Sequence, residues 1–208
     1  MAYKSAAFTQ HDVSVLACDT LYDGFFKLNK LTLTHPLFNG GTSGEVQREV
    51  VVRGEAVGVL LYDPRTQQFG MVEQVRVGVL GREQSPWLLE LVAGLMDKEG
   101  ESAAEVAHRE TLEEAGLTIE AIEPVIGYFC SPGGSTEYLT VLCAKVDLSD
   151  VQNGVFGLVE ESEDIRRHVL PVDDVIALLN QGVLNNAMTI IALQWWQLHR
   201  ARLDALWL

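Results

Sequence analysis

The chain has 208 residues, of which 48% are hydrophobic and 21% are charged, proportions typical of one folded domain with at most a small appendage. This composition excludes extensive disorder and collagen-like structure, and no apolar run approaches the ~20 residues needed to span a bilayer. With 29 acidic and 15 basic residues the net charge is −14, so we expect neither nucleic acid nor a membrane as a partner. A phosphate-bearing substrate would need local arginines or a divalent cation.

The first residues, MAYKSAAFTQHD, lack the apolar stretch of a secretory signal, so we expect the protein to be cytoplasmic. The three cysteines, Cys18, Cys130 and Cys143, are widely spaced and odd in number. They therefore predict neither a metal site nor a disulfide framework, and we expect them to be buried, reduced thiols.

Short extended segments come first in chain order. Residues 13–21 and 25–33 are rich in apolar and β-branched residues and flank the turn-like Tyr22-Asp23-Gly24, and a glycine-rich loop follows at 38–44. Beyond this loop, apolar segments separated by turn residues predict strands over 46–53, 56–62, 69–77, 88–92 and 137–146. We expect residues 1–48 to form a small antiparallel β-domain in front of a larger domain at 49–208.

Helical periodicity predicts three helices, over 102–115, 172–179 and 186–206. The first begins with a capping-box pair, Ser102 and Glu105, and Gly116 suits the left-handed residue that closes a helix. The third is expected to bury one apolar face, formed by Ile190, Ile191, Leu193, Trp195, Leu198 and Leu203. Strands mixed with helices that are separated in sequence predict an α+β fold or an α/β sandwich.

The first helix carries three clustered carboxylates. Glu110, Glu113 and Glu114 stand at i, i+3 and i+4, so they project from neighbouring positions on one side. Like charges at this spacing each disfavour an isolated helix by about 0.2–0.5 kcal/mol. The helix dipole also disfavours anions near the C-terminal end. We therefore expect a positive group to compensate these charges.

Clustered carboxylates without histidine or cysteine suit a hard divalent cation, Mg²⁺ above all, because such ions prefer oxygen ligands. The alternative is a solvated acidic face, which is the commoner explanation of an isolated Glu-x-x-Glu-Glu. What favours a metal site is the whole spacing on a capped helix, Glu101-x7-Arg109-Glu110-x2-Glu113-Glu114-x-Gly116-Leu117.

This spacing resembles the Nudix box, G-x5-E-x7-R-E-U-x-E-E-x-G-U with U aliphatic, the signature of hydrolases that cleave nucleoside diphosphates linked to another moiety. The chain departs from it twice: six residues separate Gly94 from Glu101 where the family has five, and Thr111 replaces the first aliphatic residue. We expect the additional residue to bulge outward from the loop and to leave the Ala93 carbonyl in place. The resemblance implies a Nudix α/β/α sandwich with a mixed sheet.

Within this family the chain looks most like the bacterial-type ADP-ribose pyrophosphatases. Pro132 stands 16 residues beyond the box glycine, Gly116, as it does in those enzymes. Other stretches that look like the same enzymes are Leu21-Tyr22-x-Gly24-Phe25-Phe26, Glu73-Gln74-x-Arg76, Pro86-Trp87-Leu88-Leu89-Glu90, Glu163-Asp164-Ile165-Arg166 and Ile191-Ala192-Leu193-Gln194-Trp195. The resemblance covers nearly the whole chain and implies hydrolysis of ADP-ribose to AMP and ribose 5-phosphate by metal-activated water.

The resemblance also implies roles around the metal. It implies Mg²⁺, with Mn²⁺ as the alternative, at two or three ions per site, held by Glu110, Glu114, Glu163 and the backbone carbonyl of Ala93. The base would be Glu161 in the loop at 160–164, which on the sequence alone would be an acidic surface loop. Glu113 would bind through water or support the cluster, and Arg109 would orient a carboxylate.

For substrate recognition the resemblance implies aromatic stacking on adenine and arginines on phosphate or base. A homodimer with exchanged N-terminal domains would contribute contacts to adenosine from the partner subunit, through Phe25, Phe26, Arg48 and Glu49. The other implied contacts are Arg53, Arg76, Leu95, Ser131, Gly133 and Glu137. Without the family, the phenylalanines would be a core pair of a strand and the glycines at 133–134 a hairpin turn.

Two other functions remain open. The same chemistry could act on another nucleotide sugar, which a panel of substrates would distinguish. Alternatively, a Nudix-like domain could bind ADP-ribose as a sensor without turnover. The intact Arg-Glu-x-x-Glu-Glu disfavours the sensor, because such a protein need not keep a metal-binding helix.

Overall fold

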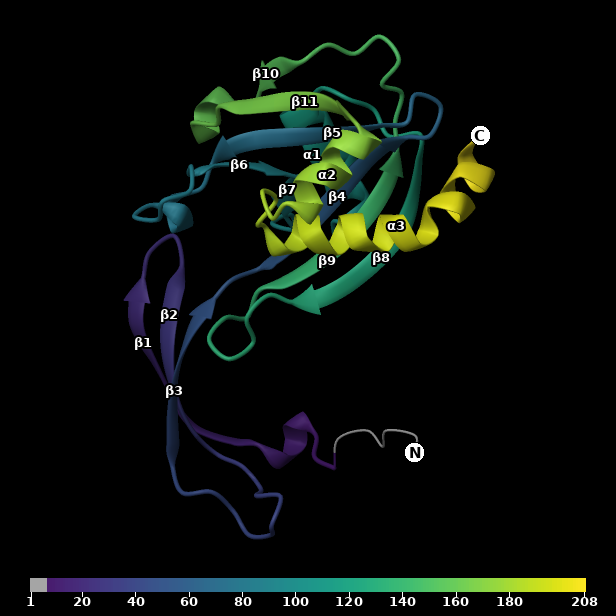
Figure 1. Cartoon of the computed structure of the whole chain (residues 1–208). Helices are drawn as coiled ribbons and strands as arrows, with labels where there is room; N and C mark the ends of the chain where they lie inside the picture. The colour runs from purple at the N-terminus through teal and green to yellow at the C-terminus, as the bar shows by residue number, and fades with distance from the viewer. Residues whose placement is uncertain (1–6) are drawn as a thin grey trace. The chain divides into compact units, whose positions relative to one another are not determined.

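The computed structural model describes residues 7–208, which divide into two compact units (Figure 1). The first unit comprises the described residues up to Gly54 together with Phe129–Glu137, and the second comprises Glu55–Tyr128 and Tyr138–Leu208. The first half of the N-terminal stretch in which no secretory signal is predicted, residues 1–6, lies outside the described residues. Among the described helices, none has both the length and the apolar character required to cross a membrane.

The first unit is built on a three-stranded antiparallel sheet in the order β1–β2–β3. Its elements are the 3-10 helix η1 (Gln10–Asp12), β1 (Ser14–Asp23), β2 (Lys27–Thr34) and β3 (Val46–Val52). Residues of the 129–137 segment bond to the end of β3, where Val51 donates to Gly134 O at 2.9 Å. Every residue of β1 is exposed, so this sheet leaves apolar side chains such as Val15 and Tyr22 uncovered.

The second unit contains an eight-stranded mixed sheet in the order β10–β11–β5–β4–β9–β8, with β6 paired to β5 and β7 paired to β4. Its strands are β4 (Glu55–Asp63), β5 (Gln68–Val75), β6 (Trp87–Glu90), β7 (Val92–Leu95), β8 (Ala121–Phe129), β9 (Tyr138–Lys145), β10 (Gly154–Phe156) and β11 (Ile165–Pro171). β4 runs parallel to β9 and antiparallel to β5 and β7. Alternate residues of these central strands therefore face two separate apolar layers.

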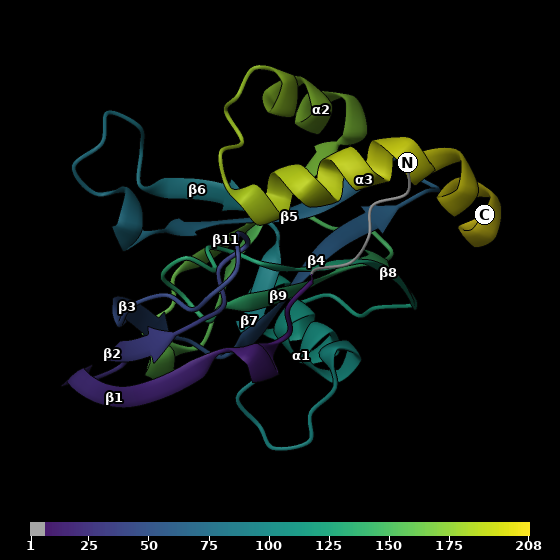
Figure 2. The same cartoon turned by 90° about the horizontal axis from the view of Figure 1, so that it is seen from below.

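Helices cover both faces of the larger sheet (Figure 2). On one face, α1 (Ala103–Ala115) packs Val106 and Ala107 into an apolar cluster with Val59 and Val72 of the sheet. On the other face, α2 (Val172–Asn180) and α3 (Ala187–Trp207) form a cluster around Trp196. Two further 3-10 helices are η2 (Val77–Val79) and η3 (Val159–Glu161). The predicted α/β/α sandwich is confirmed.

The prediction for α3 is partly wrong. Leu193 and Leu203 are buried as expected, but Trp196 and not Trp195 fills the core, and Leu198 is exposed. The expectation for the cysteines also holds only for Cys143, because Cys18 and Cys130 are exposed.

The strand prediction needs two corrections. The segment at 88–92 is not one strand: β6 pairs with β5 and β7 pairs with β4, so the chain changes partner at Leu91. Three strands were not predicted. Pro124 interrupts the apolar pattern of β8, β10 has only three residues, and β11 begins with the polar run Arg166-Arg167-His168.

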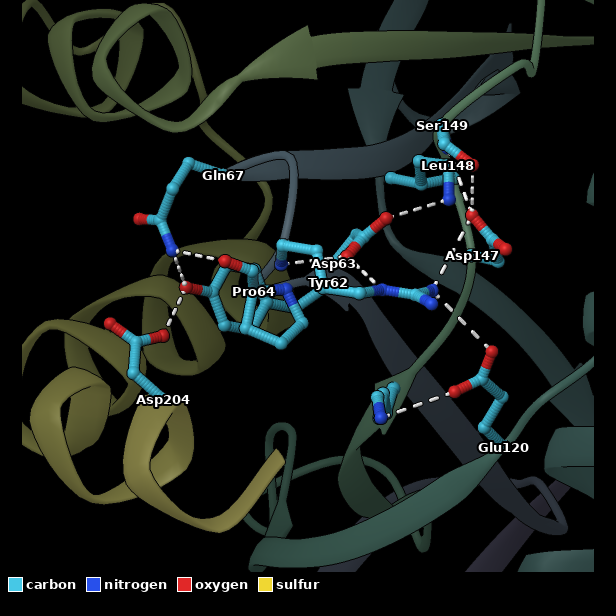
Figure 3. A network of polar contacts seen from close by, with 11 residues as sticks. Tyr62, Asp63, Pro64, Gln67, Glu120, Asp147, Leu148, Ser149 and Asp204 are labelled. Carbon is cyan, nitrogen blue, oxygen red and sulfur yellow. Dashed lines mark hydrogen bonds and ion pairs between the residues drawn. The ribbon is translucent and has the colours of Figure 1, made fainter. Parts of the chain in front are cut away.

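A polar network holds the turn between β4 and β5 (Figure 3). Asp63 is fully buried, and its carboxylate accepts the backbone N–H groups of Leu148 and Arg65, each at 2.9 Å. On the preceding residue, the Tyr62 hydroxyl donates to Asp204 of α3. Burial alone would raise the pKa of Asp63, but the hydrogen bonds and the Arg65 guanidinium outweigh it, so the pKa lies below its ordinary value. The turn is thus joined to α3 and to the segment after β9.

Candidate active site

The helix that carries the acidic cluster is delimited by its own sequence. The Ser102 side chain accepts the Glu105 N–H at 3.3 Å, and the Glu105 carboxylate accepts the Ser102 N–H at 2.8 Å. At the other end Gly116 adopts φ 61°, the left-handed conformation that glycine accepts most readily. The predicted capping box and helix end are therefore confirmed, and they set the limits of α1.

Arg109 lies among the acidic side chains. Its Nε and Nη2 donate to the two carboxylate oxygens of Glu101 at 3.1 and 3.2 Å. Its Nη1 donates to Glu110 Oε1 at 2.6 Å and to Glu113 Oε2 at 3.4 Å, and Nη2 also reaches the Leu95 carbonyl. The hydrogen bonds with Glu101 raise the pKa of the guanidinium. Arg109 thus supplies one of the positive charges that the acidic helix requires.

Glu110 packs against β7. A methyl group on Gly94 would lie 1.8 Å from Glu110 Oε1, so the carboxylate has its place only because this residue is glycine. Burial raises the pKa of Glu110 to about 7; Arg109 opposes this rise, and the charges of Glu113 and Glu163 add to it. Burial thus disfavours the ionised form of this carboxylate, and Arg109 alone offsets that only in part.

Glu114 is the more deeply buried carboxylate, at 2% exposed. Its Oε2 accepts the Ala93 N–H at 3.0 Å, and its Oε1 accepts the Gln74 amide at 3.3 Å. Burial raises its pKa to about 8, and the charges of Glu110 and Glu163 add to the rise, while the two hydrogen bonds oppose it. Each oxygen of this carboxylate thus accepts one hydrogen bond, from β7 or from β5.

The loop between β10 and β11 brings a further carboxylate to this cluster. Glu163 accepts the Leu158 N–H at 3.0 Å, which closes the loop on itself. Its charge acts on both Glu110 and Glu114. Glu161 is the last residue of η3 on the same loop and is exposed to solvent. The structure therefore brings Glu163 within electrostatic range of Glu110 and Glu114, a placement that spacing alone could not indicate.

Arg76 is held by a buried acid. Its Nε donates to Glu90 Oε2 at 2.7 Å, and the other Glu90 oxygen accepts the Asn186 amide at 2.6 Å. Asn186 is also the N-cap of α3, where its side chain accepts the Thr189 N–H. Sequence reasoning gave no role to Glu90, Gln74 or Asn186. Glu90 and Gln74 lie within stretches that resemble the family, and Asn186 carries a capping signal.

The remaining predicted substrate residues belong to the first unit. Phe25 is 86% exposed and meets Phe26 edge to face, with ring centroids 4.8 Å apart. The Arg53 guanidinium lies 4.4 Å from the Phe26 ring centroid and pairs with Glu137 at 3.0 Å. These four residues therefore form a continuous set of contacts, with one aromatic face left uncovered.

The other four predicted residues of the first unit make fewer contacts with one another. Arg48 and Glu49 are exposed on β3, and the Arg48 guanidinium donates to the Gln47 carbonyl at 2.7 Å. Gly133 lies in the turn after Ser131, whose carbonyl accepts the Gly134 N–H at 3.0 Å. The turn expected from the glycines is thus present.

The donor set suits a divalent cation. Within residues 7–208, no three or more His, Cys, Asp or Glu side chains already stand together as a metal-binding group. The contacts explain this, because Arg109 engages Glu110, and Ala93 and Gln74 engage Glu114. Even so, buried carboxylates with raised pKa values call for positive charge, and the donors are all oxygen atoms, which hard cations prefer. The residues present therefore fit such an ion.

Comparison with known proteins assigns the class. The NUDIX domain family matches residues 52–193, more than half of the chain, and the chain belongs to this family. It is accordingly an enzyme of the Nudix type, a class that generally needs a divalent metal.

The particular relatives narrow the comparison. The chain is 42% identical over 200 residues to the ADP-ribose pyrophosphatase of Escherichia coli (strain K12), covering 96% of this chain and 95% of that protein. It is 31% identical over 185 residues to the GDP-mannose pyrophosphatase of Yersinia pestis (strain Pestoides F), covering 88% and 91%. A crystal structure of an ADP compounds hydrolase matches with a TM-score of 0.69 at 20% identity, over 96% of this chain and 98% of that one, and supports the fold.

Proposed function

We propose that this enzyme hydrolyses the pyrophosphate of ADP-ribose to AMP and ribose 5-phosphate. The observation that carries the proposal is the buried Glu114 with the part-buried Glu110, both under the charge of Glu163, in a chain 42% identical to an ADP-ribose pyrophosphatase over 96% of its length. That likeness extends beyond the NUDIX match into the first unit, where the exposed Phe25 and the Phe26–Arg53 contact offer aromatic and cationic surface.

The proposed metal is Mg²⁺, with Mn²⁺ as the alternative and two or three ions per site. Glu110, Glu114, Glu163 and the Ala93 carbonyl would hold it. When bound, the metal would offset the charge of the pyrophosphate and acidify the attacking water. The chain's own part is to hold these oxygens in place, with Arg109 fixing Glu110 at 2.6 Å and Glu113 supporting the cluster through Arg109.

Glu161 is the proposed base that takes the proton from the attacking water. Its support is its position: it is exposed, and it lies two residues from Glu163, whose charge already acts on the α1 carboxylates. Glu161→Gln should lower kcat by about 10²–10⁴-fold, the usual contribution of a general base. The matched control is Glu160→Gln on the same 3-10 helix, which should leave kcat within a few-fold. The reverse pattern would assign the base to Glu160.

The substrate contacts remain proposals as well. Contacts to adenosine from the partner subunit are assigned to Phe25, Phe26, Arg48 and Glu49, with the aromatic rings stacking on adenine. Contacts to adenine or phosphate are assigned to Arg53 and Arg76, and the remaining proposed contacts are Leu95, Ser131, Gly133 and Glu137. The fixed Arg76–Glu90 pair supports this, because a guanidinium already held on one edge can present its other donors to an oxyanion.

We also propose a functional division into an N-terminal domain, 1–48, for dimerisation and adenosine contacts, and a hydrolase domain, 49–208. The NUDIX match beginning at residue 52 supports it. The exposed apolar side chains of β1 support a homodimer with exchanged N-terminal domains. The mass in solution, measured by light scattering, should be twice that of the chain. A monomer at micromolar concentration would contradict the exchange. A cytoplasmic location is proposed with this function.

One substrate panel tests the proposal. ADP-ribose, GDP-mannose and a uridine-based sugar nucleotide are incubated with Mg²⁺, with Mn²⁺ and with chelator, and nucleoside monophosphate release is measured. We expect ADP-ribose to be hydrolysed at least tenfold more efficiently than the others, and the chelator to abolish turnover. Faster hydrolysis of GDP-mannose would support the alternative that the Yersinia relative suggests. Tight binding of ADP-ribose without hydrolysis would make the protein a sensor.

A further inference from the structure

The C-terminal end of α1 concentrates negative charge. Glu110, Glu113 and Glu114 occupy its last two turns, and no basic residue stands in its last turn. The unpaired carbonyls of a helix end add partial negative charge at the same place. Arg109 pairs with Glu101, Glu110 and Glu113. The carbonyl groups at the end of the helix need a cation from another element.

That cation is Arg167 of β11. Its guanidinium donates to the Ala115 carbonyl in the last turn of α1 and to the Gln152 carbonyl before β10. It also lies over the Phe156 ring, 4.4 Å from the ring centroid. The side chain is only 8% exposed, and burial is the sole influence on its pKa, which is lowered. Arg167 therefore has no acidic partner among the described residues.

A buried guanidinium without an acidic partner lowers the stability of the fold, because removing its charge from water costs free energy. Its presence here therefore suggests a role other than stability. The carbonyl groups of Ala115 and Gln152 and the ring of Phe156 stabilise its charge instead. Two of these three partners, Gln152 and Phe156, lie outside α1. A planar fork of donors can hold two carbonyls at once, which a single ammonium group cannot do in the same geometry. Arg167 thus joins α1 to the segment that leads into β10.

The same contacts reach the loop that carries Glu161 and Glu163. Phe156 packs on Gly116, where a methyl group would lie 2.4 Å from the ring. The next residue, Gly157, donates its N–H to the Glu113 carbonyl at 3.2 Å. At the far end of the loop, β11 begins at Ile165, which is fully buried. Both ends of the loop are therefore anchored close to Arg167.

We propose that Arg167 is a positioning residue that sets the loop of Glu161 and Glu163 against the C-terminal end of α1. This inference rests on the proposed function, because it concerns the distance between the proposed base and metal ligands. Arg167 itself touches neither substrate nor metal. Its loss should therefore lower turnover and metal affinity and should affect substrate affinity little.

The test compares Arg167→Met and Arg167→Lys with Arg202→Met. Arg202 of α3 is a suitable control because its half-exposed guanidinium pairs with Glu123 of β8 at 2.7 Å and lies over the Trp195 ring, and neither partner belongs to α1 or to the loop at 157–164. For Arg167→Met we expect kcat for ADP-ribose to fall about 10–100-fold and the Mn²⁺ dissociation constant to rise by a similar factor, as for other supporting residues of metal sites. KM should stay within about threefold. Arg167→Lys should recover part of both losses, and Arg202→Met should resemble the wild type.

Mn²⁺ affinity is read by electron paramagnetic resonance on the metal alone, and loop order by hydrogen exchange of the amides at 157–164. Faster exchange there in Arg167→Met supports the proposal. If both Arg167 variants match Arg202→Met in Mn²⁺ affinity and loop exchange, the proposal is wrong. If Arg167→Met does not fold, Arg167→Lys carries the same comparison. A wild-type protein that fails to hydrolyse ADP-ribose would overturn the proposed function, while these two readouts still decide the role of Arg167.

Discussion

Two buried carboxylates of the second unit are held in opposite ways. Asp63 accepts two backbone N–H groups and faces the Arg65 guanidinium, and its pKa is lowered (Figure 3). Glu114 accepts one backbone N–H and one amide, lies among other carboxylates, and has its pKa raised to about 8. Both side chains are nearly inaccessible, at 0% and 2% exposed, and burial raises the pKa of each, but only around Asp63 do the hydrogen bonds and the guanidinium outweigh it.

The comparison separates a structural charge from a functional one. The chain compensates Asp63 completely with its own donors, so that the ionised form stabilises the turn between β4 and β5. It compensates Glu114 only in part, and the cluster with Glu110 and Glu163 adds repulsion. The ionised form of such a carboxylate is stabilised only when a cation binds beside it, which is the behaviour expected of a metal ligand.

The largest expected effect is on the activity of Glu114→Gln. A metal ligand contributes several kcal/mol to a reaction of this kind, and each 1.4 kcal/mol is about tenfold in rate, so turnover of ADP-ribose should fall at least about 100-fold. The metal-free protein should melt at the same temperature or higher, because ionisation of this carboxyl in the unfolded wild type favours unfolding at neutral pH and is absent from the variant. Release of AMP and a thermal melt in chelator measure the two effects. Activity within fivefold of the wild type would show that Glu114 holds no metal.

Gly94→Ala should disturb the same cluster by shape alone. The new methyl group would lie 1.8 Å from Glu110 Oε1, so the carboxylate must move. By analogy with displaced supporting groups, turnover should fall about 10–100-fold. The matched control is Gly44→Ala, at a position where a methyl group meets nothing within 4 Å and no substrate contact is proposed, with thermal melts to show that both variants fold. Full activity of Gly94→Ala would mean that Glu110 is free to shift without loss.

Asp63→Asn should lower the stability of the fold and leave turnover unchanged, which is the opposite of the effect expected for Glu114→Gln. Hydrogen bonds to a charged group are worth about 1.5–3 kcal/mol, so the free energy of unfolding should fall by about 2–3 kcal/mol. The kcat of the folded fraction should remain within about twofold. Urea unfolding followed by fluorescence gives the first quantity. A loss of turnover larger than the unfolded fraction would contradict the separation of the two regions.

The two carboxylates should also give opposite pH dependence in the metal-free protein. The folded pKa of Asp63 is below its unfolded value of ~3.9, so its contribution is complete above that value and is lost as pH falls through the folded pKa. The folded pKa of Glu114, about 8, is above its unfolded value of ~4.3, so stability falls as pH rises between the two. The deficit of Asp63→Asn should therefore shrink in acid, and Glu114→Gln should gain on the wild type from pH 5 to 8. Melting temperatures that run parallel to the wild type, below about pH 4 for Asp63→Asn and from pH 5 to 8 for Glu114→Gln, would refute the assignment.

Local signals explain which parts of the fold could be predicted. The limits of α1 follow from Ser102, Glu105 and Gly116, whose side chains or backbone act within a few residues. β11 could not be found in this way, because the buried Arg167 breaks its apolar pattern and is satisfied only by carbonyls of other elements. β6 and β7 were merged for a similar reason, since nothing in the sequence marks the change of pairing partner at Leu91.

The site divides in the same way. Spacing on one helix predicted that Glu110 and Glu114 share a side, but their burial depends on β7, β5 and Gly94. The approach of Glu163, from a distant loop, was implied only by resemblance to a family. Residues that hold other residues, such as Gln74 and Glu90, carry no chemical signature of their own, and only the folded contacts identify them.

The smallest expected effect distinguishes the two kinds of donor around Asp63. Arg65 is nearly half exposed and lies 3.4 Å from Asp63 Oδ1, 3.4 Å from Asp147 and 3.5 Å from Glu120. In Arg65→Met the two backbone N–H bonds of Asp63 remain, so the loss of stability should be about 1 kcal/mol or less and should diminish further in about 1 M salt. Urea unfolding at two salt concentrations measures it against Asp63→Asn. If the two variants lost equal stability, the guanidinium and not the backbone would compensate Asp63, and its contrast with Glu114 would reduce to the presence or absence of one neighbouring cation.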